Sequence, residues 1–324
     1  MSSRGTPMTS PRYKAVFVSP HLDDAVFSCG GEIARLVQEG PVLVLNLFTR
    51  YPSEVKLHAI VLGAERYREE EAAARFLGFA SHNFGELDAP FRYPDYRSPG
   101  NLFRPPVRED LEVYLPELRE RVFAYLAGID YEHLYVPLAI GWHVDHMLTY
   151  LLFEPWIGQD KLIHYEDAPY CLVPHATRCR LDELGTYPLQ AGDRSLAPTG
   201  DWRAWWSAAM AYAETALMKN LRPRIVRWFA VPVVSVYLYR LMALHRRLAA
   251  NTTKNSVLQP FTQSVNDVFP HKLEAMTLYH SQFREFFTDP KDCDKLYAAY
   301  ASLMHLPDGP VERFWKFGPR TSRP

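Results

Sequence analysis

A histidine and two adjacent aspartates stand within four residues of one another near the start of the chain, at His21, Asp23 and Asp24. An imidazole and carboxylates can hold a metal ion or move protons, and burying them costs free energy unless a metal or a reaction uses them. The apolar run 15–18 before them is typical of a buried strand, and residues 32–40 after them are typical of a helix that ends at a glycine. Because α/β sheets bind ligands at the carboxyl ends of their strands, this stretch is a candidate site.

A second group of the same kind, His143, Asp145 and His146, follows another apolar run. If both runs are strands of one parallel sheet, their carboxyl ends lie at the same edge and the two groups meet. His21, Asp24 and His146 would then supply two imidazoles and a carboxylate, which suits a catalytic zinc ion with one position open for water. Iron-like metals accept the same donors, so the ligands do not fix the metal. The alternative is that both histidines are hydrogen-bonded polar residues in ordinary turns.

The apolar runs that would carry these groups alternate with amphipathic stretches. The expected strands span 15–18, 41–48, 82–87, 131–138 and 161–165, and the expected helices span 32–40, 64–78, 111–126, 201–218 and 271–287. Alternation of strand and helix is typical of α/β proteins, so we expect a Rossmann-like, doubly wound, mostly parallel sheet with right-handed crossovers. A helical insertion and a C-terminal extension are expected to follow it.

Strand-like runs become rare after about residue 170. We therefore expect an α/β catalytic core over 11–170, a mainly helical insertion over 171–270 that serves substrate binding or an interface, and a C-terminal helix and tail over 271–324 that returns to the core. Residues 88–106 are rich in proline, tyrosine and arginine and are expected to form a surface loop. The insertion contains an aromatic cluster, for which core or interface packing and a platform for a sugar or lipid aglycone remain alternatives. The cluster comprises Trp202, Trp205, Trp206 and Tyr212.

The composition excludes several classes of protein. The chain has 324 residues, 48% of them hydrophobic, and a net charge of -1, so it offers no basic surface for a nucleic acid. Four scattered cysteines without a CxxC pair indicate free thiols, and residues 1–10 lack the apolar core of a signal peptide. The stretch 228–244 contains Pro232 and Arg240 and is shorter than the roughly 20 residues that span a bilayer. We therefore expect a cytoplasmic protein.

Both groups of ionisable residues stand in short motifs. They read Pro20-His21-Leu22-Asp23-Asp24, followed by Gly30-Gly31, and His143-Val144-Asp145-His146. These motifs resemble those of the PIG-L/LmbE family of metal-dependent N-deacetylases, which remove N-acetyl groups from GlcNAc-type sugars. Corroborating likenesses are Arg66, Leu87-Asp88, Tyr165-Glu166-Asp167 and His280-Ser281-Gln282.

The likeness covers roughly residues 13–170 and 271–285, and two departures limit it. The family usually has proline where this chain has Leu22 and Val144, so we expect altered loop rigidity rather than a lost metal site. Residues 171–270 have no counterpart, and substrate choice is expected to reside partly there.

By resemblance, His21, Asp24 and His146 would hold the metal, expected to be Zn²⁺ with Fe²⁺ as the alternative. Asp23 would act as general base and then as general acid. His143, if protonated, would stabilise the oxyanion of the reaction.

The remaining residues of the motifs are assigned supporting roles. Asp145 would orient an imidazole or support its charge. Four residues are candidates for contacts with sugar hydroxyls: Arg66, Asp88, Glu166 and His280. The alternative is structural pairing, for instance of Arg66 with Glu69 or Glu70 of its own helix.

The expected function is therefore a zinc-dependent hydrolase that removes an N-acetyl group from an N-acetylglucosamine-type sugar on a small molecule, a glycolipid or a natural product. Its partner would be the N-acetylated amino sugar, and an assembly of identical chains is left open. Two alternatives remain: a deacylase of another N-acyl scaffold, such as a glycosylated peptide antibiotic, and a non-catalytic sugar-binding protein of the same fold. The basic flanks of 225–244 also leave contact with a membrane surface open.

Overall fold

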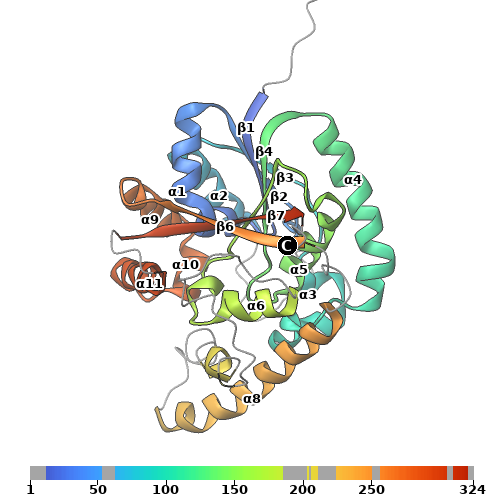
Figure 1. Ribbon diagram of the computed structural model, residues 1–324, viewed down its shortest axis with the longest axis vertical. Coiled ribbons are helices and arrows are strands. Elements are labelled where there is room, and N and C mark those ends of the chain that lie inside the picture. Colours follow the sequence, from blue (N-terminus) through green and yellow to red (C-terminus); the bar gives the residue numbers. More distant parts are fainter. Residues whose placement is uncertain are drawn as a thin grey trace, which may run out of the picture.

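One seven-stranded sheet organises the computed structural model, which describes residues 12–52, 63–184, 203, 206–210, 224–249, 256–304 and 309–319. The strands are β1 (Arg12–Ser19), β2 (Val42–Asn46), β3 (Ala80–Asn83), β4 (Asp130–Pro137), β5 (Leu162–Tyr165), β6 (Ser256–Ser264) and β7 (Val311–Pro319). Their order across the sheet is β3-β2-β1-β4-β5-β7-β6 (Figure 1). The first five strands are mutually parallel, whereas β7 runs antiparallel to both β5 and β6.

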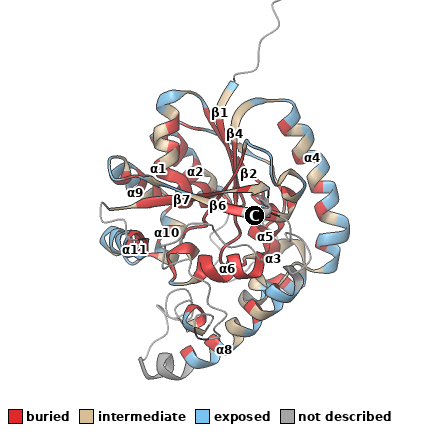
Figure 2. Cartoon of the chain, viewed as in Figure 1, coloured by how far each residue is buried: buried red, intermediate tan, exposed pale blue. Residues whose placement is uncertain are grey.

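Helices cover the sheet on both faces. They are α1 (Asp24–Glu39), α2 (Gly63–Leu77), α3 (Ala89–Arg92), α4 (Leu115–Ala127), α5 (Val144–Leu152), α6 (Ala176–Leu184), α8 (Arg224–Ala249), α9 (Phe269–Leu278), α10 (His280–Phe286) and α11 (Pro290–Leu303). Because successive side chains of a strand point to opposite faces, Ala15 and Phe17 of β1 join the core with α1 and α2, and Val16 and Val18 join the core with α4 and α5. The central strands are accordingly buried along most of their length (Figure 2).

The predicted α/β fold with a mostly parallel sheet is confirmed, but the C-terminal part differs from expectation. Strands β6 and β7 were not predicted, and they extend the sheet beyond β5 as an antiparallel pair. The single helix expected over 271–287 is two helices, because the backbone leaves the helical region at Tyr279 (φ -85°, ψ 57°).

The surface loop expected over 88–106 is confirmed only in part, because several of its residues are exposed whereas others are buried. This segment contains α3 and two short 3₁₀ turns, and Ala89 and Tyr96 are fully buried in it. Arg92 and Tyr96 of this segment belong to the interior network described below. Composition alone therefore misjudged the depth of this segment.

The C-terminal strands are fastened to α1 at the Gly30-Gly31 pair. Glu312 of β7 accepts hydrogen bonds from the backbone nitrogens of Gly31 (2.8 Å) and Glu32 (2.9 Å), and it pairs with the fully buried Lys272 of α9 (2.7 Å). A Cβ atom on Gly30 would lie 2.9 Å from Lys272 Cγ, and one on Gly31 would lie 2.5 Å from a methyl of Val265. The glycine pair is thus explained by close approach of the C-terminal elements.

Helix α8 packs on α6 at one end of the molecule (Figure 1). Within the described ranges, no helix has the combination of length and hydropathy needed to cross a membrane. Of the predicted aromatic cluster, Trp206 lies in a short helical stretch, whereas Trp202, Trp205 and Tyr212 fall outside the described residues. The four cysteines are buried and free, as predicted.

Candidate active site

The carboxyl ends of β1, β4 and β5 meet at one edge of the sheet, and each delivers ionisable side chains there. His21, Asp23 and Asp24 follow β1, and Asp24 begins α1, where the positive end of the helix dipole favours a carboxylate. His143 and His146 stand at the start of α5, after β4. The structure thus brings the two sequence motifs together.

The turn from β4 into α5 is tightly constrained. Gly141 has φ +93°, and a Cβ atom there would lie 2.4 Å from Cγ of Tyr170. Ala139 and Trp142 also have positive φ values, of 62° and 59°. His143 then caps α5, since its Nδ1 accepts a hydrogen bond from the backbone nitrogen of Asp145 (3.3 Å). This turn places His143 and His146 at the site.

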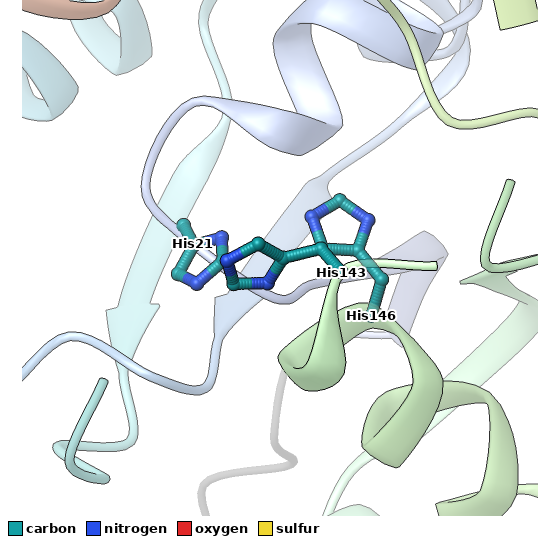
Figure 3. A group of neighbouring side chains, drawn as sticks. All are labelled: His21, His143 and His146. Atoms are coloured by element: carbon teal, nitrogen blue, oxygen red, sulfur yellow. The ribbon is translucent and has the colours of Figure 1, made fainter. Parts of the chain in front are cut away.

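The Asp24 carboxylate lies between two imidazoles. Its Oδ2 is 3.0 Å from Nδ1 of His21 and 3.2 Å from Nε2 of His146. His143 is the third ring of the group, and one ring nitrogen from each histidine lies within 4.8 Å of the others (Figure 3). All four side chains are buried or half-buried.

These donors fit a divalent metal ion. Atoms bound tetrahedrally to one zinc ion at ~2.0–2.1 Å lie about 3.3 Å apart, which is close to the separations around Asp24 Oδ2. Nitrogen and carboxylate donors also suit zinc or iron better than magnesium or calcium. The predicted set of His21, Asp24 and His146 is therefore geometrically sound, and His143 offers a further nitrogen to the same space.

Each of the two imidazoles that contact Asp24 is oriented by a second carboxylate. Nε2 of His21 lies 3.2 Å from Oδ2 of Asp145, and Nδ1 of His146 lies 2.7 Å from Oδ1 of Asp167. The Asp167 side chain is itself held by the backbone nitrogen of Ile140 (2.9 Å). Such carboxylate–imidazole pairs fix ring orientation and raise ligand basicity in metal sites.

Asp23 faces a different partner from its neighbour Asp24. Arg66 Nη2 donates to Asp23 Oδ1 at 2.8 Å, and Arg66 Nη1 is 4.0 Å from Asp88 Oδ2. Burial, and next the charge of Asp24, raise the pKa of Asp23, and Arg66 opposes that shift. Burial likewise raises the pKa of Asp88 to about 6. Arg66 therefore pairs with these carboxylates and not with Glu69 or Glu70 as the alternative interpretation expected.

His143 is neutral in this environment. Burial, and next the neighbouring His21, lower the pKa of His143 to about 3. Because Nδ1 accepts from a backbone nitrogen, the ring proton resides on Nε2. The protonated His143 considered in the sequence analysis is therefore not the form that the structure favours.

Two residues that were predicted to contact the substrate, Glu166 and His280, have partners outside the cluster around Asp24. Glu166 is buried, and its carboxylate accepts hydrogen bonds from four side chains of the protein. These are Arg313 (2.5 Å), Trp315 (2.8 Å), Thr177 (3.0 Å) and Tyr300. His280 has a side chain 60% exposed and lies 3.7 Å from Glu69, with which Glu65 completes a separate group of potential donors. We therefore leave Glu166 out of the substrate contacts proposed below.

Sequence reasoning missed two residues at the site, Asp167 and Arg92. It quoted the segment that contains Asp167 but chose its neighbour Glu166, and consecutive residues after a strand face different ways. Arg92 lies in the segment that was expected to form a surface loop, and its side chain points into the buried part of that segment. No local pattern marks it, because its partners come from distant segments.

Comparisons with known proteins match the part of the chain that carries both motifs. A family model described as PIG-L: GlcNAc-PI de-N-acetylase matches residues 16–157, which include both motifs. The chain is 29% identical over 167 residues to 2'-N-acetylparomamine deacetylase of Streptomyces fradiae, covering 49% of this chain and 58% of that protein. It is 28% identical over 195 residues to the protein of the same name from Niallia circulans, covering 50% of this chain and 70% of that protein.

Solved structures resemble the chain over nearly its whole length. A deacetylase of the teicoplanin biosynthesis pathway has a TM-score of 0.60 at 18% identity and covers 95% of this chain and 99% of its own. The A40926 pseudoaglycone deacetylase Dbv21 has a TM-score of 0.54 at 19% identity and covers 96% of this chain and 100% of its own. At these identities the likeness establishes the fold. The match to the family model covers residues 16–157, which is less than half of the chain, and it includes both motifs.

Proposed function

We propose that the protein is a metal-dependent N-deacetylase that acts on an N-acetylated amino sugar of the kind found in aminoglycosides. The observation that carries this proposal is the Asp24 carboxylate between two carboxylate-oriented imidazoles, with a separate buried carboxylate, Asp23, beside it. The names of the two relatives support the substrate class. Their alignments cover only part of each chain, so the activity of the whole protein stays a proposal.

In this proposal His21, Asp24 and His146 hold the metal, with zinc expected and iron as the alternative. A divalent cation supplies a Lewis acid for the amide carbonyl and lowers the pKa of a water molecule. The chain's own contribution is to fix the donors: Asp145 orients the ring of His21, and Asp167 orients the ring of His146.

Asp23 is the proposed general base and acid. It takes a proton from the attacking water as the oxygen bonds to the carbonyl carbon, and it delivers that proton to the nitrogen as the C–N bond breaks. Acetate and the free amine are the products. Because Arg66 occupies Oδ1, we assign the proton transfer to Oδ2. Burial raises the pKa of Asp23, which makes it a stronger base than an ordinary aspartate and suits this task.

His143 is the proposed donor to the developing oxyanion. Its Nδ1 is engaged by the backbone of α5, so Nε2–H is the group available to donate. A neutral imidazole can serve in this role, because a fixed hydrogen-bond donor in a water-poor site stabilises developing charge without itself being charged.

Substrate contacts are proposed for Asp88, which lies 4.0 Å from Arg66, and for the exposed His280, while Arg66 is proposed chiefly to hold Asp23. The region 171–270 is proposed to shape the substrate side. Tyr237 of α8 donates to the carbonyl of Gly100 (2.9 Å), and His245 of α8 lies 2.9 Å from the carbonyl of Phe103.

The ring of Phe103 in turn meets the ring of His143 edge-on, with centroids 6.0 Å apart. Helix α8 therefore supports a wall beside the proposed oxyanion donor. This arrangement is consistent with a substrate or interface role for the insertion.

The decisive experiment removes divalent metal with a chelator, restores Zn²⁺ or Fe²⁺, and measures free amine from a panel of substrates. The panel contains N-acetylated aminoglycosides, N-acetylglucosaminides and an N-acylated glycopeptide. We expect activity to vanish with the metal, to return with it, and to be greatest on an N-acetylated aminoglycoside. A protein without stoichiometric metal that stays inert after metal is added would support the non-catalytic sugar-binding alternative and overturn the proposal.

A further inference from the structure

Arg92, at the end of α3, lies between two buried carboxylates that come from different parts of the chain. Its side chain is 4% exposed. Nε donates to Asp110 at 2.8 Å, Nη2 donates to Asp145 at 2.8 Å, and Nη1 donates to the carbonyl of Leu87 at 2.8 Å. The planar guanidinium thus uses its donors on three separate acceptors, which an ammonium group could not reproduce in this geometry.

The carboxylate of Asp145 connects this arginine to the proposed metal site. Its Oδ1 accepts from Arg92, and its Oδ2 accepts from the backbone nitrogen of Ala89 (3.0 Å) and lies 3.2 Å from Nε2 of His21. One side chain therefore links the short helix α3, the first turn of α5 and an imidazole that contacts Asp24. The orientation of that imidazole depends on the orientation of Asp145.

The surroundings of Arg92 leave it little freedom. Its guanidinium lies 5.0 Å from the ring centroid of Tyr114, 5.1 Å from that of Phe48 and 5.6 Å from that of Tyr96. Tyr96 also donates to Asp110 at 2.6 Å. Aromatic faces and hydrogen-bonded carboxylates together hold the cation in one place.

We infer that Arg92 is a positioning residue of the metal site, which holds Asp145 against His21 and joins the turn of Asp88 to the same carboxylate. This inference rests on the proposed metal-binding role of His21. Without the cation, Asp145 would be a buried carboxylate with an unsatisfied oxygen, and it would rotate away from its position against His21. The His21 ring would then lose its fixed orientation, and metal affinity would fall.

The test compares Arg92→Gln with a matched control, Arg313→Gln. Arg313 is also a buried arginine paired with a buried carboxylate, Glu166, whose hydrogen-bond partners described above do not include His21, Asp24 or His146. Zn²⁺ affinity is measured by competition with a chromophoric chelator, and the free energy of unfolding of the metal-free protein is measured by urea denaturation. We expect both variants to be less stable, and only Arg92→Gln to bind Zn²⁺ about 10–100-fold more weakly.

A double variant identifies the route of the effect. If Arg92 acts through Asp145, Arg92→Gln combined with Asp145→Asn will weaken Zn²⁺ binding by less than the product of the two single effects. The inference would be overturned if the loss of Zn²⁺ affinity in the double variant equalled the product of the two single losses. It would also be overturned if Arg92→Gln bound Zn²⁺ as tightly as wild type.

The outcomes separate this inference from the proposed function. Wild-type protein that binds no stoichiometric metal contradicts the proposed function itself. If wild-type protein binds Zn²⁺ and Arg92→Gln binds it equally tightly, only the role of Arg92 is contradicted. If Arg92→Gln does not fold, Arg92→Lys serves instead: it keeps the charge but loses the fork, so an intermediate loss of affinity supports the inference and wild-type affinity refutes it.

Discussion

Two buried ion pairs, at different places in the molecule, are built from the same kinds of side chain. At the edge of the sheet, Arg92 binds Asp145, whose other oxygen meets the ring of His21. Beneath α1, Lys272 binds Glu312, whose two oxygens meet backbone nitrogens of the glycine pair and the residue after it. We call the first the site network and the second the C-terminal clamp.

The site network and the C-terminal clamp differ in what the carboxylate contacts besides its cation. A carboxylate that meets an imidazole sets the orientation and basicity of a metal ligand, so its cation bears on chemistry. A carboxylate that meets backbone nitrogens fixes a chain segment, so its cation bears on folding. Burial alone does not distinguish the two, because both pairs are removed from water at a similar cost.

The largest effect is expected inside the site, from Asp23→Asn. This change removes the proposed proton acceptor and leaves the donors around Asp24 in place, so kcat should fall by about 10²–10⁴-fold while Zn²⁺ binding is retained. Amine release and metal content of the same preparation provide the measurement. Near wild-type turnover would mean that another group moves the proton.

Breaking the C-terminal clamp should have a large effect of another kind. Lys272→Met leaves Glu312 buried without its cation, which should lower the free energy of unfolding by about 3–5 kcal/mol. Zn²⁺ affinity should stay unchanged, in contrast to Arg92→Gln. Urea denaturation tests the first point and chelator competition the second, with Lys291→Met at an exposed position as the control. A loss of metal affinity in Lys272→Met would erase the distinction between the two networks.

A smaller effect is expected from Gly31→Ala. The added methyl would lie 2.5 Å from Cγ1 of Val265 and 3.0 Å from Glu312, so we expect a loss of about 1–3 kcal/mol in stability from overpacking. The second change Val265→Ala should restore part of that loss. Gly40→Ala is the control, since its nearest neighbour would be 3.6 Å away. Equal stability of Gly31→Ala and wild type would show that the clamp does not need the close approach.

The last effect appears only at acidic pH and concerns β5, the strand that pairs with β7 of the clamp. His164 of β5 is buried against Phe317 of β7, and neither of its ring nitrogens has a hydrogen-bond partner in the described part of the chain. Burial, and next Arg180, lower its pKa to about 3. The unfolded chain binds a proton near pH 6.5, so stability falls as the pH drops from there towards 3.

Because of His164, the free energy of unfolding should be about 2 kcal/mol lower at pH 5 than at pH 7. Denaturation of wild type and His164→Phe at both pH values measures it, because the variant should lose that part of the pH dependence. Parallel pH profiles for the two proteins would show that His164 does not contribute.

Local patterns predicted much of the site. His21, Asp23 and Asp24 follow a recognisable apolar run, and His143 and His146 follow another, so their meeting followed from the parallel sheet alone. The short range of these signals also explains the failure at Glu166 and Asp167. Which of two adjacent carboxylates faces the site depends on the backbone path after β5, and that path is set by contacts with β7 and with α5.

The sequence by itself determined the donors, their order along the chain and the edge of the sheet at which they lie. Strand and helix periodicities are local, and they carry that information. Only the tertiary structure decided how the donors are held. Arg92 reaches Asp145 across 53 positions of the chain, His21 reaches it across 124, and Glu312 reaches Gly31 across 281. Such pairings depend on how distant segments pack, and no pattern within one segment records them.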